Sequence, residues 1–162
     1  MKKLVAAGIV CLVLICAVLI ATRTVLRSNE EPSGLEVVDI SIKDPKPSLL
    51  NPRSITIAHG ESVTLNLTVQ NKGSNITRGM VYTVGLEVIT SGGNAYWQLP
   101  PEQVIGIDLG PGGTSRHTFT VINKKELPFR GACEFQAYIK SVETGEVIAR
   151  SDTITIEVRY PA

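Results

Sequence analysis

Residues 62–71 read Ser-Val-Thr-Leu-Asn-Leu-Thr-Val-Gln-Asn (SVTLNLTVQN), and this stretch decides the fold class. Apolar and polar side chains alternate along it, so the pattern repeats every two residues, which is the period of a β-strand. The apolar set, which begins at Val63, is expected to face a core, and the polar set, which includes Asn66, is expected to face water. The stretch therefore predicts a strand with one buried face.

The same alternation recurs along most of the chain from Leu35 onward, and turn-forming residues separate the repeats. The predicted core-facing residues are Val38, Ile40 and Ile42; Tyr82, Val84, Leu86 and Val88; Ile105, Ile107 and Leu109; Phe119 and Val121; Cys133, Phe135, Ala137 and Ile139; and Ile154, Ile156 and Val158. Seven or eight short strands at this spacing predict an all-β fold, an immunoglobulin-like antiparallel β-sandwich over residues 35–160.

The start of the chain has a different pattern, an apolar run of eighteen residues that begins at Leu4 and ends at Ala21. Two lysines precede the run, and two arginines follow it closely. As a helix it would measure about 27 Å, which matches the hydrocarbon layer of a membrane. We expect an uncleaved signal-anchor, a transmembrane helix within residues 1–27, with the lipid bilayer as its partner.

A cleaved signal peptide is the alternative for this segment. The apolar region of a signal peptide usually spans about 7–15 residues and ends at a small-x-small cleavage site. Here the run is longer, and Leu19 breaks that pattern before Ala21. A lipoprotein site is not indicated, because Val10 precedes Cys11 and Ile15 precedes Cys16. Both cysteines are expected to pack within the helix.

Residues 28–34 (SNEEPSG) read as a polar linker between the anchor and the sandwich. The chain beyond Arg27 carries 12 basic and 15 acidic residues, a net charge of −3. This balance does not favour binding to nucleic acid. The triplets Asn66-Leu67-Thr68 and Asn75-Ile76-Thr77 are candidate glycosylation sites and favour a domain outside the cytoplasm.

The composition also limits the chemistry, with three cysteines and two histidines in the whole chain. Three cysteines do not make a disulfide framework, and two histidines make a protein-only zinc site hard to assemble. No Gly-x-Ser-x-Gly motif accompanies His59 or His117, so we interpret both as solvated turn and strand residues and expect no enzyme. Cys133 shares its strand face with Phe135 and is expected to be a buried thiol. We expect no cofactor and no metal.

Residues 58–73 (AHGESVTLNLTVQNKG) carry a hairpin signature, and residues 109–121 (LGPGGTSRHTFTV) read as a second turn and strand. Together these segments resemble the immunoglobulin-like surface domains of the CARDB type and related modules of archaeal surface-layer proteins. The resemblance implies the sandwich fold over residues 35–160 and a place at the cell surface. Within the signature, Gly60 is expected to make a tight turn, and Asn71-x-Gly73 to reverse the chain through a positive φ.

Two segments are candidate contact loops for a partner. Residues 123–130 combine charged side chains with Leu127 and Phe129, and residues 96–101 hold Trp97, the only tryptophan. Apolar side chains on a long connection can serve a protein or carbohydrate partner. The alternative, which we favour, is that these side chains fold back onto the sandwich.

Three functions are consistent with these features. The first is a membrane-anchored, non-catalytic module that binds a cell-envelope protein or another copy of itself through loops or strand edges. The second is an accessory subunit of a membrane machine, similar in plan and length to small archaellum stator subunits. The third is a secreted filament subunit, in which a freed segment up to Lys43 completes the sheet of a neighbour as a donor strand.

Overall fold

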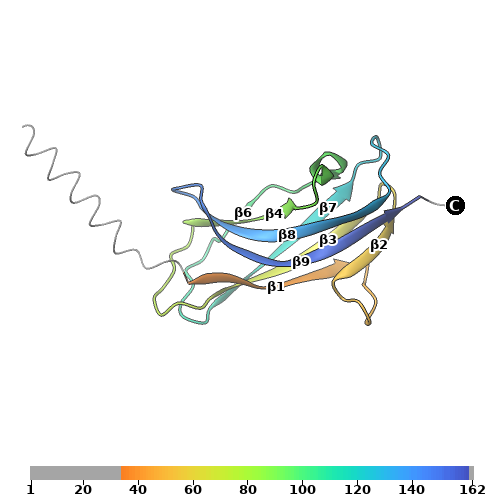
Figure 1. Ribbon diagram of the computed structural model, residues 1–162. Helices are drawn as coiled ribbons and strands as arrows, with labels where there is room; N and C mark the ends of the chain where they lie inside the picture. Colours follow the sequence, from red (N-terminus) through yellow and green to blue (C-terminus); the bar gives the residue numbers. More distant parts are fainter. Residues whose placement is uncertain (1–33, 161–162) are drawn as a thin grey trace, which may run out of the picture. The chain divides into compact units, whose positions relative to one another are not determined.

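The structure, a computed structural model, describes residues 34–160, and these form two β-sheets packed face to face (Figure 1). One sheet has the order β1 (Leu35–Asp44), β3 (Ser62–Asn71), β7 (Thr114–Asn123) and β5 (Trp97–Gln98). The other has the order β2 (Ser54–Ala58), β9 (Val147–Arg159), β8 (Gly131–Ser141), β4 (Tyr82–Val88) and β6 (Gln103–Val104). A short 3-10 helix, η1 (Gly93–Tyr96), precedes β5. The all-β sandwich is confirmed, although two of the nine strands in this range have only two residues.

The predicted anchor in residues 1–27 lies outside the described residues, as does the predicted linker except for Gly34. The described residues belong to one compact unit, Gly34–Ala162. Within residues 34–160, no helix combines the length and the apolar character needed to cross a membrane.

β3 shows why the alternating sequence folds in this way. Its four alternate apolar side chains, from Val63 to Val69, are all 0 % exposed, and the polar side chains between them lie on the outer face. β3 pairs with β1 on one side and with β7 on the other, both antiparallel. From the second sheet, the fully buried residues that complete the core include Val84, Phe135, Ala137, Ile139, Ile154 and Ile156. Burial of each large apolar side chain contributes about 1.5–3 kcal/mol.

β2 corrects the prediction of a wholly antiparallel sandwich. It pairs in parallel with β9, from Ser54 opposite Thr155 to Ala58 opposite Arg159. The chain leaves β1 at the edge of one sheet and enters the other sheet at its edge, as β2 beside β9. A period of two indicates a strand but carries no information on the direction of its neighbour.

A β-bulge in β1 corrects one predicted core residue. The pairing with β3 shifts between Val37 and Asp39, and a bulge moves the following residues to the opposite face. Val38 is therefore 42 % exposed, whereas Ile40 and Ile42 are buried as predicted.

Residues 105–109 do not form the predicted strand. Ladder pairing with β4 covers only Gln103–Val104, and Leu109 makes an isolated bridge to Thr77. Ile105 and Leu109 are buried, but Ile107 is 56 % exposed. The segment follows the irregular chain of residues 77–80 instead of a straight strand, since the N–H of Met80 donates to the carbonyl of Ile105 over 2.7 Å.

Gly73 has a different role from the predicted one. Gly60 has a φ of 82° as expected, but Gly73 is not among the residues with a positive φ. Instead, Gly73 packs against Gly34, where an added Cβ would lie 2.2 Å from the nitrogen of Gly73. The fully buried Asn71 holds this turn, because its Oδ1 accepts from the N–H of Gly73 over 2.9 Å and its Nδ2 donates to the carbonyl of Leu109 over 2.8 Å.

Candidate interaction surface

His59 lies in the turn between β2 and β3, as predicted. Its Nε2 is 3.1 Å from the carbonyl oxygen of Lys125, and its ring is 4.8 Å from the ring of Tyr160. Within residues 34–160, no three His, Cys, Asp or Glu side chains are grouped so that they could hold a metal ion. The contact with Lys125 ties the β2–β3 turn to the β7–β8 loop.

His117 corrects the prediction of a solvated strand histidine, because it is only 6 % exposed. It shares the inward face of β7 with Phe119. Its Nε2 is 3.0 Å from the hydroxyl of Ser115, and its Nδ1 is 3.2 Å from Oε1 of Gln103. Gln103 belongs to β6, so these contacts join the two sheets along one side of the sandwich. Burial lowers the pKa of His117, which favours the neutral imidazole.

Acidification from about pH 7 to about pH 5.5 is expected to destabilise the fold through His117. A histidine in the unfolded chain has a pKa near 6.5, and burial depresses the pKa of His117 in the folded state. Neutral His117 therefore contributes its full share to the stability of the fold above pH 6.5, and this contribution is lost as the pH falls through the folded-state pKa of His117. We expect His117→Gln, which keeps polar side-chain atoms at this position, to lose less stability over this interval in urea unfolding. If the native protein and His117→Gln lost equal stability between pH 7 and pH 5.5, His117 would not be the cause of the acid destabilisation.

The outer face of the second sheet carries a polar cluster centred on Glu102. Its Oε2 accepts from the hydroxyl of Thr83 over 2.9 Å, its Oε1 accepts from the hydroxyl of Tyr138 over 2.8 Å, and Lys140 donates to the same Oε1. The hydrogen bond from Lys140 is the main cause that lowers the pKa of Glu102. Burial, followed by the contact with Glu102, raises the pKa of Tyr138 to about 12. The cluster fastens the segment before β6 to β4 and β8.

A shallow groove of about 500 Å³ lies beside this cluster, lined in part by Glu87, Tyr138 and Lys140. The charged groups there are paired with one another, Lys140 with Glu102 and Glu87 with Arg150, the latter over 2.9 Å. Such ion pairs are common on the surfaces of folded proteins.

Cys133 and Trp97 belong to the core. Cys133 is 0 % exposed, which confirms the predicted buried thiol, and burial raises its pKa against the opposing effect of the Trp97 indole. Trp97 is 2 % exposed, and its ring meets that of Phe135 edge to face at 4.9 Å. Of the two roles considered for Trp97, the structure shows packing within the sandwich, so its side chain offers no contact surface.

In the predicted contact loop between β7 and β8, one of the two named apolar side chains packs against the sandwich and the other is exposed. Phe129 stacks on Tyr96 with the ring centres 4.6 Å apart and packs against the core. Leu127 is 39 % exposed. Only Leu127, of the three residues named from the sequence, presents much of its side chain to a partner.

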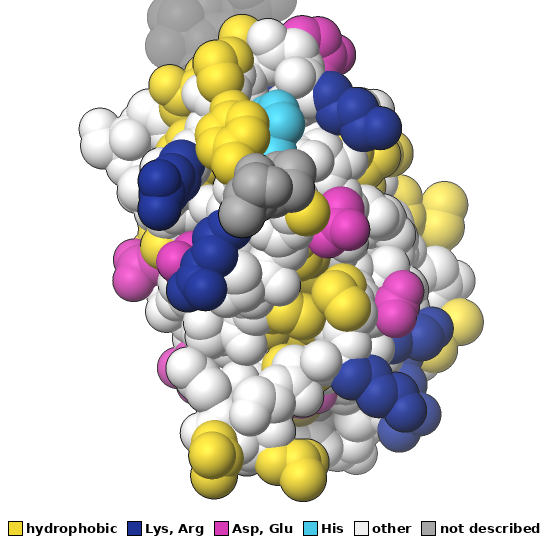
Figure 2. Space-filling view, turned by 90° about the vertical axis from the view of Figure 1, so that its right-hand side faces the viewer, with side chains coloured by type: hydrophobic (Ala, Val, Ile, Leu, Met, Phe, Trp, Pro, Cys, Tyr) yellow, Lys and Arg dark blue, Asp and Glu magenta, His cyan; other side chains and the backbone are white. Residues whose placement is uncertain are grey.

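Among residues 34–160, the most exposed apolar side chains lie in a loop that is not one of the contact loops predicted from the sequence. Leu49 and Leu50 are 99 % and 96 % exposed, in the connection from β1 to β2 (Figure 1). The N–H of Asn51 donates to the carbonyl of Ser48 over 3.1 Å, so the two leucines occupy the central positions of a β-turn. Those positions favour proline, glycine, asparagine and aspartate, and neither leucine contributes to the core. Figure 2 views the end of the sandwich where β9 stops, and hydrophobic side chains project at the lower margin of that view.

The loop that carries Leu49 and Leu50, residues 45–53, is restricted by prolines and fastened to the second sheet at its C-terminal end. It contains three prolines, at positions 45, 47 and 52, which restrict the backbone. Near its end, Arg53 donates to a carboxylate oxygen of Asp152 over 2.7 Å, and the Arg53 carbonyl accepts from the N–H of Thr155 over 2.9 Å. The sequence signal for this site was an apolar pair outside any alternation and between prolines.

The two sequons occupy different settings. Asn66 lies on the outer face of β3, where its Oδ1 accepts from the hydroxyl of Thr118 over 3.0 Å. Asn75 is exposed in the segment between β3 and β4, and its carbonyl accepts from Nδ2 of Asn71 over 2.7 Å. Neither side chain points into the core, so their glycosylation stays a prediction.

No protein-family model and no curated protein matches the chain. Among solved structures, the C-terminal domain of wzt is similar over 80 % of this chain and 76 % of that one, with 12 % identity and a TM-score of 0.51. The CARDB domain of a Pyrococcus furiosus protein is similar over 81 % of this chain and 99 % of that one, with 17 % identity and a TM-score of 0.47. A Niemann-Pick type C2 protein from the Japanese carpenter ant covers 80 % of this chain and 96 % of its own, with 8 % identity and a TM-score of 0.47. The CARDB-like resemblance suggested by the sequence is present, and it concerns the fold alone.

Proposed function

We propose that the protein is a non-catalytic interaction module, anchored in a membrane by its N-terminal segment and facing out of the cytoplasm. In this proposal the loop of residues 45–53 contacts a partner protein of the cell envelope. Leu49 and Leu50 enter an apolar pocket of that partner.

The observation that carries this proposal is the nearly complete exposure of two consecutive leucines in a loop that prolines restrict. Their 99 % and 96 % exposure means that the folded domain gains almost nothing from burying them. The prolines around them reduce the entropy that would be lost when the loop is fixed in a complex. An apolar pair on a restricted loop can therefore act as an aliphatic anchor in a pocket of a partner protein.

The sequence supports the location of the module. The apolar run from Leu4 to Ala21 has the length of a membrane span, and the two sequons lie in the domain that follows. Attachment at the N-terminus leaves the loops of the sandwich available to neighbours in the envelope.

Site-specific crosslinking tests the contact. A photo-crosslinking benzophenone amino acid replaces Leu50 in the full chain, in its native membrane, and a second protein carries the same group in place of Thr144, an exposed turn residue. We expect one discrete adduct from position 50 and none from position 144. Leu49→Asp in the first protein is expected to reduce the adduct at least about tenfold while leaving stability within about 0.5 kcal/mol.

Leu127→Asp is the matched comparison, because Leu127 belongs to the loop predicted from the sequence. Loss of the adduct with Leu127→Asp but not with Leu49→Asp would move the contact to the β7–β8 loop. The absence of any discrete adduct from position 50 would contradict the proposal.

The filament alternative is not proposed, because β1 is not a free strand. Leu35–Asp44 pairs along its length with β3 of the same chain, and Leu35, Ile40 and Ile42 are buried in the core of that chain. Donation of this strand to a neighbour would require the protein to lose part of its own sheet.

A further inference from the structure

A second group of apolar side chains is exposed where the described chain begins. Ile76, Met80, Val81, Ile107 and Val142 are 67 %, 67 %, 37 %, 56 % and 53 % exposed. These five residues define a surface that we call the entry end. Isolated exposed apolar residues are common on soluble domains, but a group on adjoining loops indicates a surface that meets another apolar phase.

Backbone hydrogen bonds bring the three segments of the entry end together. The N–H of Val142 donates to the carbonyl of Val81 over 2.8 Å. The N–H of Met80 donates to the carbonyl of Ile105 over 2.7 Å, two residues before Ile107. The segment between β3 and β4, the segment after β6 and the β8–β9 turn therefore lie side by side.

The backbone of Met80 supports a role for its exposed side chain. Met80 has a φ of 67°, the only positive φ of a residue other than glycine within residues 34–160. Glycine or asparagine is the usual residue for this conformation, and a methionine there is strained. Because the Met80 side chain is 67 % exposed, its packing within the fold offsets little of the energy cost of this backbone strain.

The entry end also adjoins the first described residue. The carbonyl of Gly34 accepts from the N–H of Lys72, so the chain enters the domain beside the segment that carries Ile76 and Met80. Twelve residues separate Ala21 from Gly34, and a chain of this length spans at most about 43 Å. A membrane that holds the apolar run is therefore within reach of the entry end.

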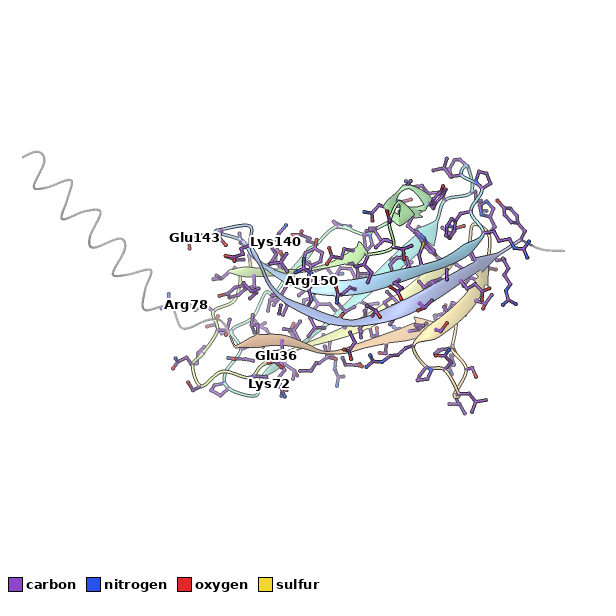
Figure 3. All side chains as sticks on the ribbon, viewed as in Figure 1. Glu36, Lys72, Arg78, Lys140, Glu143 and Arg150 are labelled. Carbon is purple, nitrogen blue, oxygen red and sulfur yellow. The ribbon has the colours of Figure 1, made fainter. Side chains whose placement is uncertain are left out.

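The charges near this end are mixed (Figure 3). Lys72 and Arg78 are balanced by Glu36 and Glu143, and Arg78 and Glu143 lie at its extremity. A surface without a basic excess has little electrostatic preference for anionic lipid. Contact with a membrane would rest on the apolar side chains, with Lys72 and Arg78 extended toward phosphates at the margin.

We propose that the entry end rests on the lipid bilayer, with Met80, Val81, Ile107 and Val142 at the boundary between headgroups and acyl chains. This inference rests on the proposed N-terminal anchor and adds a defined orientation, in which the Leu49–Leu50 loop, at the opposite end of β1, points away from the lipid. The anchor and the entry end together would determine which loops are oriented toward the envelope partner.

The test uses the full chain in phosphatidylcholine vesicles, with an environment-sensitive NBD fluorophore on one introduced cysteine. Cys11→Ala and Cys16→Ala remove the other reactive thiols, and Cys133 stays because it is fully buried. Val142→Cys reports on the entry end, and Leu50→Cys is the matched control. We expect iodide quenching at position 142 to be at least about threefold weaker than at position 50, and to change little when phosphatidylglycerol is added.

Met80→Asp in the Val142→Cys protein is expected to raise iodide quenching to the value at position 50. Resistance of the chain to carbonate extraction reports separately on the anchor. Equal quenching at the two positions in a chain that resists extraction would overturn this inference and leave the anchor intact. Extraction of the chain would contradict the proposed anchor. Protection of position 142 in native membranes but not in lipid vesicles would assign the entry end to a protein partner and also overturn the inference.

Discussion

Phe135→Ala is expected to lower the free energy of unfolding of the domain by about 3–5 kcal/mol. Phe135 is 0 % exposed on β8, and β8 is flanked by β9 and β4 in the second sheet. Its ring meets Trp97 edge to face, so removal leaves a cavity against the first sheet as well. Urea unfolding of residues 34–162 measures the change, since the buried core lies within this unit.

Glu134→Ala is the matched control for Phe135→Ala. Glu134 precedes Phe135 on the same strand and is exposed, so its replacement is expected to change stability by less than about 0.5 kcal/mol. A loss below about 1 kcal/mol for Phe135→Ala would mean that the ring is not enclosed as the structure shows.

Gly85→Ala is expected to destabilise the domain by about 1–3 kcal/mol. Tyr138 on β8 pairs with Gly85 on β4, and a Cβ on Gly85 would be 2.4 Å from the Cζ of Tyr138. The ring would have to move, which would weaken its hydrogen bond to Glu102 and return the pKa of Tyr138 from about 12 toward its ordinary value of 10. Ultraviolet titration of the tyrosines and urea unfolding measure the two effects.

Two further proteins isolate the clash. Gly106→Ala is the matched control, because an added Cβ there has nothing within 4 Å. The double variant Gly85→Ala with Tyr138→Ala is expected to lose less unfolding free energy than the sum of the losses in the two single variants. The reason is that Tyr138→Ala removes the atoms with which the new Cβ collides. Additive losses would show that the close approach is not the cause.

Much of the fold could be predicted because burial follows the alternation directly. Along β3 every second side chain is buried, and the same rule places Phe135 and Ile154 in the core. The rule fails where the chain departs from a straight strand. The bulge at Val38 depends on how β1 fits β3, and the direction of β2 depends on the path between two sheets. Such properties depend on residues distant in sequence, and a local pattern does not contain them.

The candidate site was less predictable for a related reason. Trp97 and Phe129 are large and apolar, but whether such residues face a partner or the core depends on the surface available beneath them. Leu49 and Leu50 are ordinary in composition, and their turn positions are evident only from the hydrogen bond between Asn51 and Ser48. The buried setting of His117 likewise depends on Gln103 of the opposite sheet.

The central claim, an anchored domain that faces out of the cytoplasm, is tested most directly by labelling intact cells. The full chain with Glu134→Cys, Cys11→Ala and Cys16→Ala, in which position 134 is exposed and lies outside the proposed contacts, is treated with a membrane-impermeant maleimide before and after lysis. Buried Cys133 is expected to stay unlabelled. We predict equal labelling in both samples and recovery of the labelled chain in the carbonate-washed membrane. Labelling only after lysis, or recovery of the chain in the soluble fraction, would contradict the account.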